Sequence, residues 1–271
     1  MTAESSSLSD RFAPLAQPVG SAMARNAEPS GEYSIKVAEA QGVLAQAAAQ
    51  YAGIDGGPAT VTQASSLGAE DVVISHLINS RQLDIGIFVL ETGRLHQETL
   101  ALLQRFKASS RTTVSVYTPL QESVIHFVGR EGMDAMYKSI ELRKACCDIR
   151  KMEPLNRALI DKDAWITGLR REQSGARADV SLVDISETRV KINPLANWTW
   201  GDVWHYIQTN KLDYNPLHDQ FFPSIGCEPC TRAISLGEDF RSGRWWWEDE
   251  NAKECGLHVK STESHEEESK A

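Results

Sequence analysis

The sequence has no long apolar run and no stretch that resembles a targeting signal. Its apolar runs, such as residues 87–90, fall far short of the roughly 20 residues that a membrane-spanning helix requires. The N-terminus also lacks a basic stretch followed by an apolar segment, which is the pattern of a secretory signal. We therefore expect no membrane association and a location in the reducing cytoplasm.

Positive charge is also scarce. The 271 residues include 37 acidic and 28 basic side chains, which give a formal net charge of −9 at pH 7. Proteins whose main task is to bind nucleic acid usually carry a basic surface, so we expect no nucleic-acid partner. Hydrophobic residues make up 41% and charged residues 24% of the chain, which is the composition of a folded globular protein rather than a disordered one.

Three regions of the chain differ in composition. Residues 1–33 are rich in Ser, Ala, Pro and Gly and contain few apolar residues, which predicts a flexible leader. Residues 34–247 carry regular apolar patterns and are predicted to form one domain. Residues 248–271 turn acidic and polar, which predicts a mobile tail. The sequence shows no internal repeat and leaves the oligomeric state open, a homo-oligomer included.

Within the domain, apolar runs of strand length alternate with patterns of helical period. We expect helices at residues 35–52, at 70–80, after Gly93 and at 200–208, and strands at residues 59–64, 84–90, 112–117 and 164–169. Strands separated by helices of this length form a mostly parallel sheet with right-handed crossovers and helices on both faces. The predicted fold class is therefore α/β, with a ligand at the carboxyl ends of the strands.

Residues at the ends of these strands are candidates for that ligand site. Ser65 and Ser66 begin a turn after the first strand, where hydroxyl and backbone N–H groups can bind an anion. Leu90 and Gly168 stand at the ends of two further strands and are also predicted to bind substrate. The turn is neither a Walker A loop nor a GxGxxG motif, since the required glycines and lysine are missing.

Four of the five cysteines form two pairs, Cys146 with Cys147 and Cys227 with Cys230. A CxxC pair presents two thiolates to a metal centre or forms a redox dithiol. Two adjacent cysteines would chelate one zinc ion only through a cramped ring, whereas an iron–sulfur cluster offers each thiolate its own iron. We therefore favour a [4Fe-4S] cluster on all four thiolates, with a structural zinc or buried free thiols as alternatives.

The fifth cysteine, Cys255, lies in the polar tail between Lys253 and His258. An unperturbed thiol has a pKa of about 8.5, so nearby cations would have to enrich its thiolate at pH 7. On the residues alone, a working nucleophile and an incidental surface cysteine both stay open.

Basic residues gather in three short segments of this acidic chain. They lie around the vicinal cysteines, after the fourth strand and before three successive tryptophans: Arg143, Lys144, Arg150 and Lys151; Arg170, Arg171 and Arg177; Arg241 and Arg244. Guanidinium groups bind phosphate and sulfate bidentately, so the segments favour an anionic nucleotide as ligand. For any single arginine, a solvated charge paired with an acid is the alternative.

Taken together, these motifs resemble those of the assimilatory adenylyl-sulfate reductases, the cluster-containing branch of the sulfonucleotide reductase family. The resemblance runs from about Val61 to His258. Its motifs are residues 65–71, which resemble the family's modified PP-loop, and residues 91–96, 146–151, 167–171, 226–231, 241–247 and 254–258. The combination is highly specific.

The resemblance implies an adenine-nucleotide α-hydrolase-like fold and reduction of adenosine 5'-phosphosulfate to sulfite and AMP, with thioredoxin as electron donor. It implies a [4Fe-4S] cluster on the four paired cysteines and makes Cys255 the nucleophile. It also implies six contacts to the phosphosulfate, namely Lys151, Arg171, Arg177, Arg241, Arg244 and His258. Two residues depart from the family pattern, because Glu91 stands where Asp is usual and Leu67 where a small residue is usual.

Three other functions compete with this hypothesis. The same chemistry on the 3'-phosphorylated nucleotide is the nearest, although family members that use it lack the paired cysteines. A non-catalytic iron–sulfur sensor that binds nucleotide or DNA is disfavoured by the negative charge and would leave Cys255 without a purpose. An adenylating enzyme of RNA thiolation is disfavoured because its ATP-binding glycines are missing from the turn.

Overall fold

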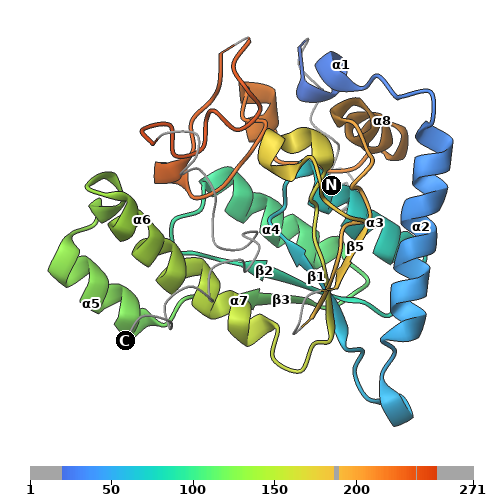
Figure 1. Cartoon of the computed structure of the whole chain (residues 1–271), viewed down its shortest axis with the longest axis horizontal. Helices are drawn as coiled ribbons and strands as arrows, with labels where there is room; N and C mark the ends of the chain where they lie inside the picture. The colour runs from blue at the N-terminus through green and yellow to red at the C-terminus, as the bar shows by residue number, and fades with distance from the viewer. Residues whose placement is uncertain (1–19, 186–188, 236, 249–271) are drawn as a thin grey trace, which may run out of the picture.

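A six-stranded sheet forms the centre of the molecule in the computed structural model, which describes residues 20–185, 189–235 and 237–248 (Figure 1). The strands are β1 (Val61–Ser65), β2 (Gly86–Leu90), β3 (Val114–Tyr117), β4 (Ala164–Ile166), β5 (Val183–Ile185) and β6 (Val190–Ile192). They are arranged in the order β3-β2-β1-β4-β6-β5. Every neighbouring pair is parallel except β5 with β6. The predicted mostly parallel α/β fold is confirmed.

Helices connect the strands in the described part of the chain. They are α1 (Ala22–Asn26), α2 (Tyr33–Gln50), α3 (Ala69–Ser80), α4 (Gln97–Ser109), α5 (Gln121–Glu131), α6 (Ile140–Cys147), α7 (Glu153–Ala158) and α8 (Trp200–Asn210). A π-helical turn, η4 (Asp148–Met152), joins α6 to α7. Short 3₁₀ helices are η2 (Ile54–Gly56), η3 (Ala135–Tyr137), η5 (Arg171–Gln173), η6 (Gly175–Arg177), η7 (Pro216–Gln220) and η8 (Glu228–Cys230).

Both faces of the sheet are covered because successive strand side chains point to opposite sides. On β2, Val89 packs against Leu102 and Leu103 of α4, whereas the preceding Phe88 packs against Leu155 of α7. The largest apolar cluster joins β1, β4 and β6 to α2, α3 and α8. Figure 1 shows α5, α6 and α7 on one side of the molecule and α2 on the other. The predicted helices on both faces are therefore present.

Residues 20–33, which were predicted to belong to a flexible leader, pack on α8 and the segment after it. The Ala22 N–H donates to the Asp219 carboxylate at 2.7 Å, and the Arg25 guanidinium lies 4.3 Å from the Phe221 ring centre. A methyl group on Gly201 would approach the Glu28 carbonyl oxygen to 2.0 Å, which shows how closely this segment passes the start of α8. The sequence did not predict this because the segment has few apolar residues and is fixed by polar contacts.

Asp202 fixes the same segment to the domain. Its fully buried carboxylate accepts hydrogen bonds from the Ser30 N–H at 2.7 Å, the Thr199 N–H at 2.9 Å and the Lys36 ammonium at 2.9 Å. Burial alone would raise the pKa of Asp202, but these hydrogen bonds together lower it to about 2. The charged carboxylate therefore joins residue 30, α2 and the N-terminus of α8.

Asp202→Asn is expected to destabilise the protein by about 2 kcal/mol at pH 7. Because the folded pKa of about 2 lies below the ordinary value of 3.8, the unfolded state binds more protons than the folded state at pH values between these two. The stabilisation is therefore complete above about pH 4 and disappears as the pH falls through 2. Urea unfolding at pH 7 and at pH 3 should show a smaller difference between wild type and variant at the lower pH.

The matched control is Asp213→Asn, since Asp213 pairs with Arg105 on the surface. Exposed pairs contribute little, so this change is expected to cost less than about 1 kcal/mol. An equal cost for the two variants, or a cost for Asp202→Asn that stays the same at both pH values, would contradict the assignment.

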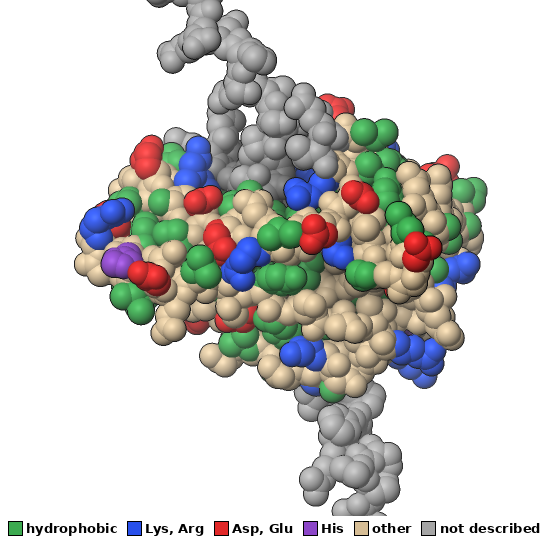
Figure 2. Space-filling model, turned by 90° about the horizontal axis from the view of Figure 1, so that it is seen from below, with side chains coloured by type: hydrophobic (Ala, Val, Ile, Leu, Met, Phe, Trp, Pro, Cys, Tyr) green, Lys and Arg blue, Asp and Glu red, His purple; other side chains and the backbone are tan. Residues whose placement is uncertain are grey.

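Charges of both signs are interspersed on the face of the molecule shown in Figure 2. That face offers no continuous band of one charge. Among the described residues, no helix combines the length and apolar character needed to cross a membrane.

Candidate functional site

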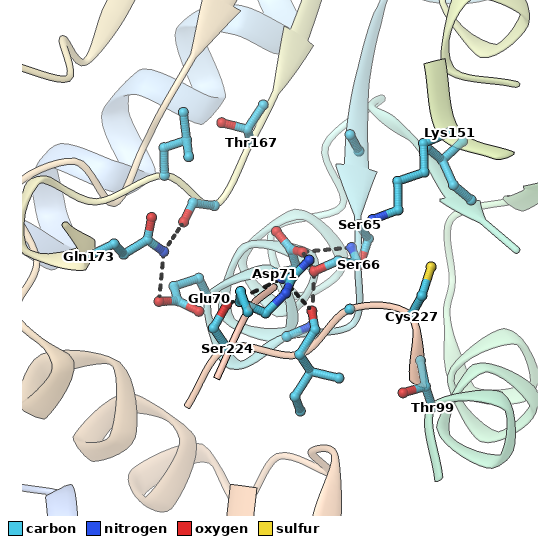
Figure 3. Close-up of a pocket in the computed structure, with 18 of the residues that line it drawn as sticks. Ser65, Ser66, Glu70, Asp71, Thr99, Lys151, Thr167, Gln173, Ser224 and Cys227 are labelled. Atoms are coloured by element: carbon cyan, nitrogen blue, oxygen red, sulfur yellow. Dashed lines mark hydrogen bonds between the residues drawn. The ribbon is translucent and has the colours of Figure 1, made fainter. Parts of the chain in front are cut away.

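A cavity of about 230 Å³ opens at the carboxyl ends of β1, β2 and β4 (Figure 3). Eight residues predicted from the sequence line it: Ser65, Ser66, Leu90, Lys151, Gly168, Arg177, Arg241 and Arg244. One wall is apolar and is formed by Phe88, Leu155 and Trp165. The cavity therefore combines an apolar wall, which suits a flat ring system, with charged side chains.

The turn after β1 is held by its own side chains. The Ser66 N–H and the Ser66 hydroxyl both donate to Asp71 Oδ2 at 2.6 Å, as Figure 3 shows. The Leu67 N–H donates to Ser65 Oγ at 3.2 Å, and the Gly68 N–H donates to Ser66 Oγ at 3.4 Å. Three successive amides of this turn are thus already hydrogen-bonded to side chains of residues 65–71.

The two departures from the family pattern have local explanations. Leu67 has a left-handed backbone, with φ of 61°, and its buried side chain packs with Val89, Leu102 and Leu103 beneath the turn. The Glu91 carboxylate accepts a hydrogen bond of 2.7 Å from the Gly93 N–H. Neither side chain lines the cavity in the described structure.

Two adjacent carboxylates at the start of α3 line the cavity. Glu70 is buried, and its Oε1 accepts hydrogen bonds from Arg170 Nε at 2.9 Å and from Gln173 Nε2 at 3.0 Å. Burial acts to raise the pKa of Glu70, but Arg170 and then Gln173 outweigh it and hold the pKa below the ordinary value. Asp71 has no such cation, and burial, with a further contribution from the Glu70 charge, raises its pKa to about 6.

Gly168 is needed because its backbone passes directly over these carboxylates. A methyl group added there would lie 2.6 Å from Asp71 Oδ1 and 2.9 Å from Glu70 Cβ. The Gly168 carbonyl also accepts a hydrogen bond of 3.0 Å from Gln173 Nε2. The residue predicted as a strand-end contact thus sets the distance between β4 and the start of α3.

Gly168→Ala is expected to cost about 1–3 kcal/mol of stability, because buried backbone and a short side chain must move apart. It should also weaken AMP binding, since Asp71 and the turn that it holds would shift. Thermal unfolding and calorimetric titration with AMP would measure both effects. Gly175→Ala is the control, because a methyl group there meets nothing within 4 Å. Equal behaviour of the two variants would contradict the close-approach argument.

The cavity is also lined by basic side chains that were predicted as anion contacts. Arg177 is buried and donates to Gln173 Oε1 at 2.6 Å. Arg244 is also buried, with its guanidinium carbon 4.7 Å from the Trp245 ring centre. Lys151 comes from the π-helical turn η4, where an extra residue per turn rotates the side chains that follow α6. The cavity is therefore lined by side chains of both charges, and the Gln173 amide links Arg177 to Glu70.

Arg171 does not reach this cavity, in contrast to the prediction. It is exposed, and its guanidinium donates to the Val180 carbonyl at 2.8 Å and to Asn197 Oδ1. The preceding Arg170 has an extended backbone, so successive side chains point in opposite directions. Arg170 therefore points inward to Glu70 and Arg171 outward.

The two cysteine pairs meet in a second, smaller cavity, which confirms that the fold brings them together. Cys146 and Cys147 end α6, and Cys227 and Cys230 flank η8. All four line this cavity, and none forms a disulfide. Basic side chains also line it, namely Arg94, Arg143, Arg150 and Lys151.

The chemistry of these donors fits an iron–sulfur cluster. Burial raises the pKa of Cys230 to about 11 and also raises the pKa of Cys146, so without a metal these two thiols stay protonated. Four closely spaced thiols become stable thiolates when a metal centre binds them, and the surrounding cations offset part of that charge. The described residues include no group of His, Cys, Asp or Glu already arranged to hold a single metal ion.

A buried ion pair ties the end of the described chain to the helix that carries the vicinal cysteines. Arg143 Nε and Nη2 donate to the two Glu248 carboxylate oxygens at 2.9 and 2.7 Å. The Arg143 guanidinium carbon also lies 4.7 Å from the Trp245 ring centre. The chain beyond Glu248 therefore starts beside the cysteine cavity. Cys255 and His258, the predicted nucleophile and one predicted phosphosulfate contact, lie outside the described residues.

Several residues of the site were not assigned from the sequence. Three of them line the cavity, namely Glu70, Asp71 and Gln173. Arg170, which was grouped with the basic residues, donates a hydrogen bond to Glu70. Arg150 was grouped with the basic residues, but its role is local: it donates to the Thr92 carbonyl at 2.7 Å. The one available signal was the acidic pair directly after the Ser-rich turn, an unusual neighbour for a predicted anion site.

Comparisons with known proteins identify related sequences. The family model described as the phosphoadenosine phosphosulfate reductase domain matches residues 60–233. An adenosine 5'-phosphosulfate reductase from Burkholderia cepacia is 53% identical over 198 residues, which cover 72% of this chain and 79% of the relative. One of the same name from Allochromatium vinosum is 49% identical over 201 residues, which cover 73% of this chain and 78% of the relative.

Solved structures support the fold. A phosphoadenylyl-sulfate reductase from Candida auris, crystallised with phosphate, gives a TM-score of 0.59 at 26% identity and covers 73% of this chain and 92% of its own. The FMN adenylyltransferase of Candida glabrata, solved with FAD and pyrophosphate, gives a TM-score of 0.53 at 10% identity and covers 94% of this chain and 85% of its own. The second likeness concerns the fold alone.

Proposed function

Since the chain belongs to the phosphoadenosine phosphosulfate reductase family, we propose that it reduces adenosine 5'-phosphosulfate to sulfite and AMP in assimilatory sulfate reduction. The relatives from Burkholderia cepacia and Allochromatium vinosum are named for that substrate. The reducing cytoplasm is the location that suits its thiol chemistry.

One observation carries the proposal: the nucleotide-sized cavity and the cysteine cavity adjoin. Lys151, Cys227 and Trp245 line both. A ligand whose anionic end lies near Lys151 is therefore held beside the four cysteines. This arrangement suits a reductase whose reacting group is the sulfate end of a nucleotide.

The division of the cavity orients such a nucleotide. We place the adenine ring against the wall of Phe88, Leu155 and Trp165, because a flat aromatic ring loses contact with water when it packs on apolar side chains. The phosphosulfate then extends toward Lys151, Arg177, Arg241 and Arg244, which offset its charge. His258 is proposed as a further contact.

In the first step, the Cys255 thiolate attacks the sulfur of the phosphosulfate. A sulfur–sulfur bond forms, and the bond between sulfur and the phosphate oxygen breaks with its electron pair staying on AMP. The enzyme is left with an S-sulfonate on Cys255. The basic side chains lower the barrier by stabilising the charge that develops on the leaving phosphate.

In the second step, a dithiol protein of the thioredoxin type supplies two electrons. One donor thiolate attacks the Cys255 sulfur and releases sulfite, which leaves a mixed disulfide. The second donor thiolate then resolves that disulfide, so the donor is oxidised to a disulfide and Cys255 returns to the thiolate. Sulfur passes from the sulfate to the sulfite oxidation level, which accounts for both electrons.

Cys146, Cys147, Cys227 and Cys230 would hold a [4Fe-4S] cluster. When bound, the cluster would supply structural cross-linking and electrostatic stabilisation, since the thiols of Cys255 and the donor account for the electron transfer. Arg143 and Arg150 lie beside these ligands and would offset their negative charge.

The test is mass spectrometry of the intact, anaerobically purified protein after mixing with adenosine 5'-phosphosulfate without reductant. A sulfonate that maps to Cys255 and is removed by thioredoxin would support substrate, nucleophile and donor together. If the protein contains iron and binds nucleotide but gains no sulfonate, the covalent mechanism is wrong.

A further inference from the structure

Gly226 lies where the two cavities adjoin. The segment from Ser224 to Cys227 runs along the nucleotide-sized cavity (Figure 3), and Cys227 lines the cysteine cavity as well. The buried Thr231 hydroxyl accepts a hydrogen bond of 3.1 Å from the Gly226 N–H and donates one of 2.9 Å to the Cys227 carbonyl. The backbone around Gly226 is therefore fixed from within its own loop.

The Arg244 guanidinium lies directly against this glycine. A methyl group added to Gly226 would lie 2.4 Å from Arg244 Nη2 and 2.6 Å from Arg244 Cζ. The guanidinium carbon also lies 4.7 Å from the Trp245 ring centre. Arg244 is buried, so residues 224–226 and the Trp245 ring together enclose its charged end beside the cavity.

No strong hydrogen bond holds the Arg244 guanidinium within the described part of the chain. Its Nη1 donates to Ser224 Oγ and to the Ile225 carbonyl, both at 3.4 Å, which is long for such bonds. Its Nε finds no hydrogen-bond partner among the described residues. The space left over Gly226, rather than a strong hydrogen bond, therefore determines where the guanidinium lies, and its donors remain able to bind an anion.

We propose that Gly226 is a positioning residue: because it has no side chain, it leaves the room in which the Arg244 guanidinium lies ready to bind the anionic end of the nucleotide. The inference rests on the proposed function, because it assumes that the cavity binds a nucleotide with an anionic sulfate end. It goes beyond that function by giving the residue that precedes Cys227 a role in anion binding.

The kind of atom that an added methyl group would meet separates this glycine from Gly168. At Gly168 the methyl group would meet the short Asp71 side chain and Glu70 Cβ, which cannot move without the start of α3. At Gly226 the three nearest atoms all belong to the end of the Arg244 side chain. A long side chain can turn away while the backbone stays, so Gly226→Ala is expected to fold and to displace the guanidinium.

The experiment measures the binding of adenosine 5'-phosphosulfate and of adenosine by calorimetric titration. All proteins are full-length holoproteins that carry Cys255→Ser, so that the substrate binds without reacting. Gly226→Ala should lower the affinity for adenosine 5'-phosphosulfate about tenfold, since a hydrogen-bonded charge contact is lost. The affinity for adenosine, which has no anionic group, should stay the same. Iron content should be unchanged, and the midpoint of thermal unfolding should shift by no more than about 4 °C.

A double variant tests whether the effect passes through Arg244. Arg244→Ala alone should lower the affinity for adenosine 5'-phosphosulfate at least as much as Gly226→Ala does. Adding Gly226→Ala to Arg244→Ala should then lower it no further, because the side chain that the methyl group displaces is already absent. Gly129→Ala, at an exposed residue of α5 where a methyl group meets nothing within 4 Å, is the control and should bind both compounds like the reference.

The outcomes that overturn the inference differ from those that overturn the proposed function. Equal losses of affinity for both compounds, loss of iron, a variant that does not fold, or a further loss in the double variant would each show that Gly226 does not act by positioning Arg244. An unchanged affinity for both compounds in the folded variant would refute the inference alone. If the reference protein binds neither compound, the nucleotide site is wrong, and the proposed function fails together with the inference.

Discussion

Replacing Cys227 with Ala is expected to remove iron from the protein and to lower the rate of sulfite release by at least about 100-fold. Cys227 is buried, lines both cavities and lies 3.2 Å from the Thr92 hydroxyl, so its loss removes one proposed ligand and alters the contact between the two cavities. Iron content per chain, visible absorbance and sulfite release after anaerobic purification would measure the effect.

A packing control separates loss of a ligand from general damage to this region. Met136 is buried in the same apolar cluster as Cys227, Cys230 and Trp245, and Met136→Leu conserves its volume. This variant should retain iron and most of the activity. Full iron occupancy in Cys227→Ala would show that the ligand assignment is wrong, whereas iron loss in both variants would indicate that the cavity is merely sensitive to packing.

Much of the sheet follows directly from local patterns. The strands β1 to β4 occur where short apolar runs predicted them, and α2, α3, α4 and α8 occur where helical periods did. The central strands are buried on both faces and therefore read as short apolar runs. Helices such as α4 bury one side and therefore show a helical period. The edge hairpin of β5 and β6 was not predicted, since the β5 side chains are exposed and leave no apolar pattern.

The region between β3 and β4 was also missed, for a different reason. The π-helical turn η4 inserts an extra residue between α6 and α7, which breaks the helical period in the sequence. The same irregular turn orients Arg150 toward Thr92 and brings Lys151 to the cavity. A pattern-based method is therefore weakest where the backbone is adapted to the site.

Some residues of the candidate site could likewise be predicted from the sequence, and others could not. Cysteine pairs could be predicted because their chemistry is specific and their spacing is short. The distinction between Arg170 and Arg171 could not, since it depends on Glu70, which lies about 100 positions away in the sequence and meets Arg170 only after folding. Asp71 could not be assigned either, because its hydrogen bonds to Ser66 form only when the turn folds back on the start of α3.

Replacing Cys255 with Ser is expected to reduce sulfite release by at least about 10⁴-fold while leaving iron content and AMP binding close to wild type. A serine hydroxyl is rarely ionised at neutral pH and is a poor nucleophile toward sulfur, and it cannot form the S-sulfonate from which the donor releases sulfite. Sulfite release, iron analysis and AMP titration on the same preparation would show this separation. Ser261→Ala, six residues further along the same tail, is the matched control and should retain activity.

Loss of sulfite release without loss of iron or AMP binding is expected from where the described chain ends, at Glu248. Glu248 is bound by Arg143 beside the cysteine cavity, and Cys255 follows it by seven residues, which span at most roughly 25 Å when extended. Cys255 is not one of the four proposed cluster ligands and lies beyond the described residues that line the two cavities, so we expect its substitution to remove the nucleophile and to leave iron and nucleotide binding in place. If Cys255→Ser kept wild-type turnover, another group would have to attack the phosphosulfate, and the two-step mechanism would be refuted even with the nucleotide and iron in place.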